Sequence, residues 1–313
     1  MMKMYFIINP KSGNGRTKKR WEKIIRPLIE SKNIEYNFKF TEYPNHATEI
    51  VRDLIKKGNK FIVAVGGDGT FNEVINGFFE NDKLVDPNCV FGLISSGTGS
   101  DTIKTLGHSK DFEESIEILQ KGSIKKIDIG IAKFRSFEGD IKSRYFLNIA
   151  DIGLGGDVVD RVNRTTKIFG GKISFYIGSI RGILHHKMVK TTLIFEDTGE
   201  KYECNLNLAI FANGKYFGGG MKVAPDAIND DGLLDIITAQ DMGRWKLLKN
   251  ISKMYSGKHL ELPEVKAHPR CKKIKAESEK PIFLDLDGEQ VGTTDIEINI
   301  YHKILPLKTL PIK

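Results

Sequence analysis

The chain has 313 residues, 40% of them hydrophobic and 28% charged, and a formal net charge of +8. This composition excludes a disordered chain and suffices for two folded domains, and the lack of any run of 18 uncharged apolar residues argues against a transmembrane helix. The positive charge favours an anionic partner, but scattered basic residues without interleaved aromatic residues argue against nucleic acid. Cys89, Cys204 and Cys271 offer no zinc spacing or disulfide framework, which suits the cytoplasm.

Strand and helix patterns alternate over the first 128 residues. Buried strands are expected at 5–8, 36–40, 61–65 and 90–94. Apolar residues at helical spacing predict helices over 21–29, 47–55 and 70–79, and further helices near residues 101 and 112. Pro27 should kink or shorten the first helix. This alternation predicts an α/β domain with a parallel sheet covered on both faces.

The pattern changes near residue 125, where strands begin to dominate. Strands are expected at 127–134, 145–149, 191–195, 202–211, 233–238, 282–286 and 296–301, and helices near 158–162, 175–184 and 245–255. This half predicts an antiparallel β domain with a few helices. We therefore expect domains over 1–128 and 129–304, with residues 305–313 returning to the first.

A run of small residues follows the strand expected at 61–65. Gly66, Gly67 and Gly69 surround Asp68, and Thr70 can cap the next helix. Glycines let backbone N–H groups approach a phosphate, and a helix N-terminus favours an anion. A carboxylate would repel phosphate unless Mg²⁺ or water lies between them. The loop predicts a nucleotide phosphate site with a metal-linked acid, and a plain turn with a capping aspartate is the alternative.

Two more glycine-containing loops follow strands of the same sheet. NPKSGNG occupies residues 9–15 and SSGTGSD occupies residues 95–101. The carboxyl ends of parallel strands meet at one edge, where ligands of α/β sheets bind. Neither a Walker A motif nor a dinucleotide GxGxxG motif is present in its strand–helix context. The three loops favour a phosphate site of another kind.

These motifs resemble those of the diacylglycerol kinase catalytic domain family, which includes bacterial soluble lipid kinases and sphingosine kinases. GGDGTFNEVING at residues 66–77 carries the first likeness, and INPKSGNG, FTEYPNHA, LISSGTGSD and KIDIG follow the family's pattern. GGGMKVAPDAINDDGLLDI and LDGE extend the likeness, which runs from about Met4 to Tyr301. GGDGT alone is shared with NAD kinases and phosphofructokinase relatives.

The resemblance implies an N-terminal α/β domain of the NAD kinase and phosphofructokinase kind, a C-terminal β-sandwich and an active site in the cleft between them. It implies a Mg²⁺-dependent kinase that moves the γ-phosphate of ATP to a hydroxyl of a lipid such as diacylglycerol. The partner would be a lipid at an anionic membrane surface, which a cytoplasmic protein would bind peripherally. Two alternatives stay open: an NAD kinase-like activity and a nucleotide-binding regulator without catalysis.

The resemblance also implies a nucleotide site, residue by residue. Lys11 would steady phosphate charge, with a solvated lysine as an equal alternative, and Asp68 would help to place Mg²⁺. Glu73 and Asp101 could instead serve only the first turn of their helices. The full expected set is Asn9, Pro10, Lys11, Ser12, Gly13, Thr41, Gly66, Gly67, Asp68, Gly69, Thr70, Phe71, Asn72, Glu73, Thr98 and Asp101.

The segment FLDLDGEQ at residues 283–290 is expected to carry the chemistry. Phosphoryl transfer needs a positioned hydroxyl, and a general base helps to remove its proton. Strand alternation puts Asp285 and Asp287 on one face, where two like charges raise the pKa of one of them. The resemblance places the base on Asp287, with Glu289 as runner-up. A plain Asp-Gly turn is the alternative.

The segment AINDDGLLD at residues 227–235, taken alone, predicts only a turn. The resemblance makes it a loop that holds a structural metal. Asp231 would supply a carboxylate, and Ile228 and Leu233 would supply backbone carbonyls, to a Mg²⁺ that orders the loop. Oxygen ligands of this kind suit Mg²⁺.

The sequence departs from the family pattern in one loop. Ser100 stands where the family usually has asparagine, and Ser95 and Ser96 stand where a proline is usual. The usual DFAR after the asparagine is replaced by Asp101, Thr102, Ile103 and Lys104. Serine keeps a hydroxyl but loses the donor and acceptor pair of the amide. These departures leave the identity of the acceptor open, but not the fold.

Two segments are candidates for a membrane-facing surface. His185 and His186 lie among basic neighbours, with a solvated face as the alternative. Ile168 and Phe169 form an apolar loop tip, for which a buried anchor is the alternative. The sequence decides neither the lipid, nor ATP against GTP, nor a monomer against a homodimer.

Overall fold

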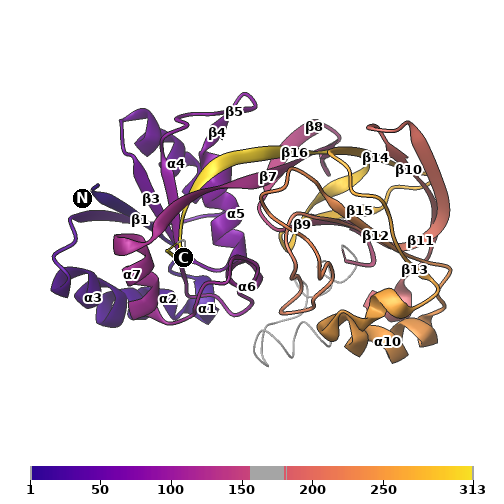
Figure 1. Ribbon diagram of the computed structural model, residues 1–313, viewed down its shortest axis with the longest axis horizontal. Coiled ribbons are helices and arrows are strands. Elements are labelled where there is room, and N and C mark those ends of the chain that lie inside the picture. The colour runs from indigo at the N-terminus through magenta and orange to yellow at the C-terminus, as the bar shows by residue number, and fades with distance from the viewer. Residues whose placement is uncertain (1, 156–179, 181, 312–313) are drawn as a thin grey trace. The chain divides into compact units, whose positions relative to one another are not determined.

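The computed structural model describes residues 2–155, 180 and 182–311. It divides into two compact units, one of Met1–Ile127 with Lys303–Lys313 and one of Asp128–His302 (Figure 1). The division falls within two long strands, β7 (Ser123–Arg135) and β16 (Glu289–Thr309), which each contribute residues to both units.

A parallel sheet forms the centre of the first unit. Its strand order is β6-β3-β1-β2, and each strand runs parallel to its neighbour. The end of β16 adds beside β6, where Leu307 pairs with Phe91. The strands are β1 (Met4–Ile8), β2 (Tyr36–Phe40), β3 (Phe61–Gly66) and β6 (Val90–Ser95), with a small hairpin of β4 (Phe79–Glu80) and β5 (Lys83–Leu84). Every residue of β3 and β6 is buried, as their continuous apolar runs predict.

Helices connect these parallel strands. They are α1 (Ser12–Gly15), α2 (Thr17–Arg20), η1 (Trp21–Ile25), α3 (Arg26–Ser31), α4 (His46–Lys56), α5 (Asp68–Gly77), α6 (Asp101–Leu106) and α7 (Phe112–Lys121). Trp21 and Ile25 are fully buried against β1 residues such as Phe6. Pro27 does not end the helical run: residues 21–25 form a π-helical turn just before it. Proline lacks an N–H and clashes with the preceding turn, and a wider turn relieves both problems.

Antiparallel strands make up the second unit. Their order is β13-β12-β11-β10-β14-β16, and β9 pairs with both β11 and β15. The elements are β8 (Ile141–Phe146), β9 (Ile149–Gly153), β10 (Val189–Phe195), β11 (Glu200–Ala212), β12 (Asp235–Gln240), α10 (Arg244–Ser256), η2 (Lys258–Glu261), β13 (Val265–Ala267), β14 (Lys273–Ser278) and β15 (Phe283–Leu286).

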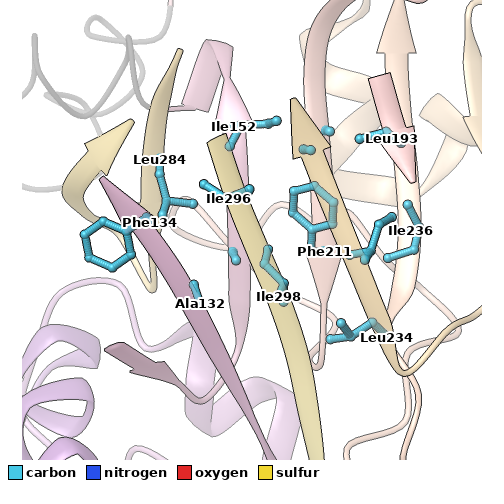
Figure 2. Close-up of a cluster of buried hydrophobic side chains, with 14 of the residues drawn as sticks. Ala132, Phe134, Ile152, Leu193, Phe211, Leu234, Ile236, Leu284, Ile296 and Ile298 are labelled. Carbon is cyan, nitrogen blue, oxygen red and sulfur yellow. The ribbon is translucent and has the colours of Figure 1, made fainter. Parts of the chain in front are cut away.

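The core of the second unit collects apolar side chains from strands that are distant in sequence. Figure 2 shows Phe134 of β7, Ile152 of β9, Phe211 of β11, and Ile296 and Ile298 of β16 in one cluster. All of them are buried. The cluster holds the strands that position the segment 283–290.

The structure corrects several expected boundaries. The strand expected at 145–149 is broken between β8 and β9, and the strand expected at 296–301 is the middle of the longer β16. The short strands β4, β5 and β13 and the strand β14 were not predicted, because short or lysine-rich segments carry little apolar alternation. The helices expected at 158–162 and over most of 175–184 lie outside the described residues.

Candidate functional site

The three glycine-containing loops of the first unit meet at the carboxyl ends of β1, β3 and β6. The Asn9 Nδ2 donates to Thr70 Oγ1 at 3.1 Å, which joins the first loop to α5. The carbonyl of Gly66 accepts hydrogen bonds from the N–H groups of Ser96 at 2.7 Å and Gly97 at 3.0 Å. The loops after all three strands therefore form one connected structure.

Asp68 ties the second loop to the third. Its Oδ2 accepts from the Ser100 N–H at 2.8 Å, and its Oδ1 accepts from the Thr102 N–H at 3.0 Å. The side chain thus caps the start of α6. Each carboxylate oxygen has a second lone pair, so these bonds leave Asp68 able to contact a metal ion. Its role beside Mg²⁺ stays a prediction.

Glycines let the loops approach closely. A Cβ at Gly97 would lie 2.5 Å from the Gly67 Cα, and a Cβ at Gly13 would lie 2.3 Å from the Ser96 carbonyl oxygen. No side chain fits at either distance. Glycine at these positions therefore lets the three loops pack against one another at this edge of the sheet.

The Gly97→Ala variant is expected to bind Mg²⁺-ATP at least about tenfold more weakly, because the new methyl group forces the loops after β3 and β6 apart. Titration calorimetry measures this change. Gly243→Ala is the matched control, since a Cβ at Gly243 meets no atom within 4 Å. Equal ATP affinity of Gly97→Ala and wild type would show that the loop contact does not shape the nucleotide site.

The serines that depart from the family pattern interact with one another and with a helix. The Ser95 and Ser100 hydroxyls lie 3.0 Å apart, and both side chains are buried. The Ser96 hydroxyl accepts from Thr17 Oγ1 at 2.8 Å, and its carbonyl accepts from Arg20 Nη1 at 2.8 Å. Arg20 of α2 therefore holds the third loop in place. The sequence offered no signal for this contact.

The other expected nucleotide residues differ in their exposure. Lys11 and Thr98 are exposed at loop positions, where they can contact a ligand. Thr41 follows β2 and is largely buried, and Phe71 and Asn72 are fully buried within α5. Phe71 therefore belongs to the core, since no part of its side chain is exposed. Pro10, Ser12, Gly13 and Gly69 belong to the connected loops, and Asp101 begins α6.

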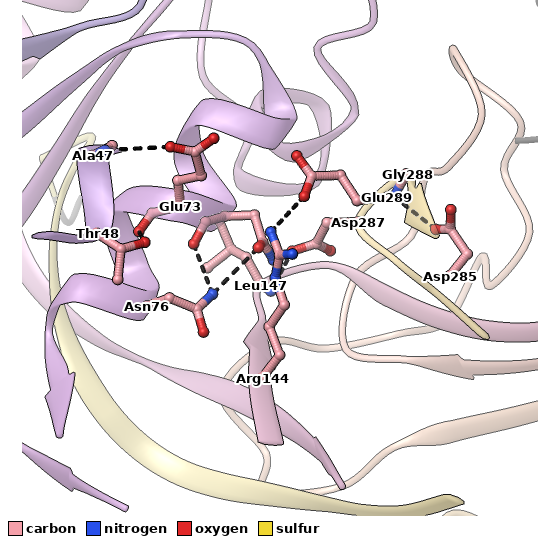
Figure 3. Close-up of polar contacts among 11 residues, drawn as sticks. Ala47, Thr48, Glu73, Asn76, Arg144, Leu147, Asp285, Asp287, Gly288 and Glu289 are labelled. Carbon is pink, nitrogen blue, oxygen red and sulfur yellow. Dashed lines mark hydrogen bonds and ion pairs between the residues drawn. The ribbon is translucent and has the colours of Figure 1, made fainter. Parts of the chain in front are cut away.

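Glu73 reaches a neighbouring helix. Its Oε2 accepts from the Ala47 N–H at 3.3 Å, and its backbone carbonyl accepts from Thr48 Oγ1 at 2.7 Å, as Figure 3 shows. The carboxylate thus lies at the N-terminus of α4, where the helix dipole favours it. The alternative, that Glu73 serves only the first turn of its own helix, is too narrow because the side chain also joins α5 to α4. Its expected role at the nucleotide stays a prediction.

In the second unit, Asp287 lies in the turn between β15 and β16 with a φ of 52°. Its Oδ2 accepts from the Leu147 N–H at 2.7 Å, and its Oδ1 accepts from the N–H groups of Asn148 at 2.9 Å and Ile149 at 3.0 Å (Figure 3). Three backbone donors fix the direction of the carboxylate. Strand alternation fails here, because β15 ends at Leu286.

Asp285 lies opposite Asp151 in the pairing of β15 with β9, and both side chains are fully buried. Burial raises the pKa of Asp285 to about 7, against a hydrogen bond from the Gly288 N–H that lowers it. Burial and the charge of Asp285 raise the pKa of Asp151 well above its usual range. The raised pKa expected in this segment is thus on Asp285, and burial is its first cause.

Glu289, the runner-up base, forms an ion pair with Arg144 (Figure 3). The Glu289 side chain is partly exposed and the Arg144 side chain is largely buried. The guanidinium of Arg144 therefore occupies part of the hydrogen-bonding capacity of the Glu289 carboxylate. This contact makes Glu289 a weaker candidate for a base than an unpaired carboxylate would be.

The loop expected to hold a structural metal is joined to an arginine. Arg270 Nη1 lies 3.2 Å from Asp231 Oδ2, its Nε lies 3.1 Å from Asp235 Oδ1, and its Nη2 donates to the Asp226 carbonyl at 2.9 Å. Asp231 Oδ1 accepts from the Leu233 N–H at 3.0 Å. The loop fits a divalent cation poorly in this arrangement, because a guanidinium already balances its carboxylates.

Replacing Arg270 with glutamine is expected to destabilise the second unit by about 1–2 kcal/mol, because two partly buried carboxylates lose their counter-ion. Burial already raises the pKa of Asp235, and Arg270 opposes that rise. Scanning calorimetry measures the loss of stability in the variant. A second scan in EDTA tests whether a bound metal stabilises the loop. We expect EDTA to leave the Tm of the wild type unchanged. A wild-type Tm that falls in EDTA and recovers with Mg²⁺ would restore the metal at Ile228, Asp231 and Leu233.

An apolar cavity of about 80 Å³ lies within the second unit. Its walls include Leu208 and Ile210 of β11, Ile237 of β12, and Ile251 and Met254 of α10. Almost all of the exposed lining is apolar. The sequence did not predict this cavity, because its walls come from strands and a helix far apart in the chain.

The two segments expected at a membrane give no support to that role. His186 is buried, so the pair His185 and His186 does not form a continuous exposed patch. Ile168 and Phe169 lie outside the described residues. Across 2–155, 180 and 182–311, no helix combines the length and apolar character needed to cross a bilayer.

Family models match both parts of the chain. The model of the diacylglycerol kinase catalytic domain matches residues 3–132. The model of the YegS C-terminal NAD kinase beta sandwich-like domain matches residues 148–309. The second match alone covers more than half of the chain, and the two lie in the order expected for one family.

Curated relatives and solved structures agree with these matches. A diacylglycerol kinase of Mycobacterium tuberculosis is 28% identical over 264 residues, which cover 84% of this chain and 81% of the relative. One of Staphylococcus carnosus is 26% identical and covers 91% of this chain and 88% of its own. A crystal structure from Bacillus anthracis, of a protein assigned as a diacylglycerol kinase, has a TM-score of 0.78 at 26% identity and covers 99% of this chain and 95% of its own. Yeast NADH kinase, at 13% identity and a TM-score of 0.55, shares the fold.

Proposed function

Since the chain belongs to the diacylglycerol kinase catalytic domain family, and is therefore a kinase that transfers a phosphate group to a lipid hydroxyl, we propose that its donor is ATP and its acceptor diacylglycerol. The connected loops of the first unit carry the donor part of this proposal. They offer backbone N–H groups, a helix N-terminus at α5 and small residues at one edge of a parallel sheet, which together suit a polyphosphate.

Mg²⁺ would join the ATP phosphates to the protein. Asp68 is the carboxylate best placed among the loop residues, since it lies at their junction. Bound Mg²⁺ would neutralise charge that develops on the transferred group. The chain's own contribution is to hold Asp68 in a fixed direction by the N–H groups of Ser100 and Thr102.

Asp287 is the proposed base for the acceptor. Its three backbone donors hold it as an oriented carboxylate. Such a carboxylate can accept the hydrogen of a lipid hydroxyl and point the oxygen lone pair toward the phosphate. Proton transfer to Asp287 then accompanies formation of the new P–O bond, and the bond to the ADP oxygen breaks.

The apolar cavity of the second unit is the observation that best supports a lipid as the acceptor. Apart from Asn250 and His259, its lining is apolar, with leucine, isoleucine, phenylalanine and methionine side chains that favour hydrocarbon. Each methylene that leaves water for such a site contributes about 0.8 kcal/mol. NAD has no long apolar part that could use this cavity, and the yeast NADH kinase likeness concerns the fold alone.

A transfer assay with γ-labelled ATP tests the proposal. The protein is incubated with Mg²⁺ and a panel of diacylglycerol, phosphatidylglycerol, undecaprenol, a sphingoid base and ceramide in mixed micelles, with NAD in a separate reaction. We expect label in phosphatidic acid. Label in another lipid would replace the proposed acceptor, and label only in NAD would overturn the lipid assignment. Replacing ATP with GTP in the same assay tests the donor, and gel filtration tests the open question of a homodimer.

A further inference from the structure

The solvent-facing side of α10 carries a set of residues that the proposed reaction does not use. The helix has four basic residues and no acidic residue: Arg244, Lys246, Lys249 and Lys253. Trp245 near its start is 80% exposed, and Tyr255 near its end is 44% exposed. Tryptophan and tyrosine have an apolar ring and a polar tip, and both are enriched at membrane–water interfaces.

Helical geometry separates this side of α10 from the side that packs on the sheet. Successive residues are about 100° apart around the axis. Leu247, Ile251 and Met254 lie on one side and line the apolar cavity. Trp245 and Lys249 lie on the opposite side. Trp245 therefore takes no part in the core of the second unit, and its exposure has no explanation in packing.

The cations of α10 are mostly available to a partner. Lys246 pairs with Glu264. Within the part of the chain that the structure describes, Arg244, Lys249 and Lys253 form no ion pair. An exposed tryptophan beside unpaired cations is the composition of helices that lie in the surface of an anionic bilayer.

We propose that α10 docks the protein on an anionic lipid bilayer, with Trp245 at the headgroup level and Lys249 and Lys253 against lipid phosphates. This inference rests on the proposed function, because a lipid acceptor requires the protein to reach a bilayer. A second copy of the chain is a poorer occupant. A two-fold contact through α10 would bring the same cations together, and like charges repel.

Tryptophan fluorescence tests the docking directly, because the chain has two tryptophans and the other, Trp21, is fully buried in the first unit. The full-length protein is titrated with phosphatidylcholine vesicles that contain about 30% phosphatidylserine, a composition that supplies the anionic surface without any lipid of the acceptor panel. Neither ATP nor acceptor is present. We expect a blue shift and quenching by lipids with brominated acyl chains. We also expect binding to weaken as salt screens the charges.

Variants separate the two contributions. Lys249→Gln with Lys253→Gln should lower the vesicle partition coefficient about 25-fold, since each basic residue near an anionic surface contributes about fivefold. Trp245→Ala should lower it about tenfold, as measured by co-sedimentation. Phe137→Ala, which removes another side chain that is 58% exposed, and Lys18→Gln with Lys19→Gln, which removes the same charge from α2, should leave it unchanged.

Several outcomes would overturn the docking surface. These are absence of vesicle binding by the wild type, binding without quenching by brominated lipids, or losses in the control variants as large as those in the α10 variants. A blue shift that appears with protein concentration and without vesicles would assign α10 to self-association. Failure of the proposed function would give a different result: vesicle binding would persist, but no lipid in the micelle panel would acquire label.

Discussion

The Asp287→Asn variant should lose turnover by about 10²–10⁴-fold, the contribution of a positioned general base. The amide fits the same space, but its oxygen alone can accept from the backbone N–H groups that now bind both carboxylate oxygens. The lipid hydroxyl then loses its acceptor. The initial rate of label transfer from γ-labelled ATP measures the loss, and calorimetry should find the affinity for Mg²⁺-ATP unchanged within about twofold.

Glu289→Gln provides the matched control for that measurement. It makes the same change of carboxylate to amide two residues away and breaks the ion pair with Arg144. We expect a reduction in turnover of less than about tenfold, since a partly exposed ion pair contributes about 1 kcal/mol or less. A large loss in Glu289→Gln together with normal turnover in Asp287→Asn would move the base to Glu289. Thermal unfolding of both variants excludes loss of the fold as the cause.

The Asp285→Asn variant should be more stable than the wild type at alkaline pH. The pKa of Asp285 is raised to about 7 in the folded protein, chiefly by burial, while the unfolded chain has the ordinary value of about 3.9. The folded state therefore binds more protons between these values, and wild-type stability falls as pH rises through this window. The variant lacks this loss. We expect a difference of roughly 3–4 kcal/mol in its favour above pH 8.

Urea unfolding at pH 5 and pH 8.5 measures this effect as the stability of the second unit, which contains Asp285. The stability difference between variant and wild type should grow between the two pH values. The neighbouring Asp151, whose pKa is also raised, makes the wild type more sensitive in the same direction. Asp295→Asn is a control on an exposed segment and should follow the wild type. If the free energy of unfolding changes with pH in the same way in Asp285→Asn and in the wild type, then ionisation of Asp285 does not destabilise the folded protein.

The sequence predicted the first unit well because its strands are buried on both faces. Continuous apolar runs such as those of β3 and β6, bounded by glycine loops, identify such strands without further information. The motifs also located the glycine loops in the correct order. What they could not provide was the way in which the loops are held, since contacts such as Arg20 with Ser96 join residues 76 positions apart.

The same limit explains why some predictions for the second unit were wrong and why some of its features were not predicted. Alternation predicted that Asp285 and Asp287 share a face, but the strand ends between them and Asp287 adopts a positive φ. Periodicity describes a strand and cannot show where the ladder of hydrogen bonds stops. The cavity and the pairing of Arg270 with the loop at 226–235 depend on tertiary contacts, which leave no local pattern.

The serine departures from the family pattern also became interpretable only in the structure. Ser95 and Ser100 form a buried pair, and Ser96 contacts Thr17 and Arg20. The loss of the usual asparagine and proline is therefore accompanied by a local hydrogen-bond network. Each serine viewed alone in the sequence has no such meaning.

The transfer of a phosphate group from ATP to a lipid hydroxyl can be tested directly with an isotope label. The protein is incubated with diacylglycerol micelles, Mg²⁺ and ATP that carries ¹⁸O on the non-bridging oxygens of its γ-phosphate. Mass spectrometry then examines the lipid product. We expect phosphatidic acid whose phosphate retains the labelled oxygens and is joined through the unlabelled hydroxyl oxygen of the lipid. Labelled free phosphate with no phosphorylated lipid would contradict it, because the nucleophile would then be water.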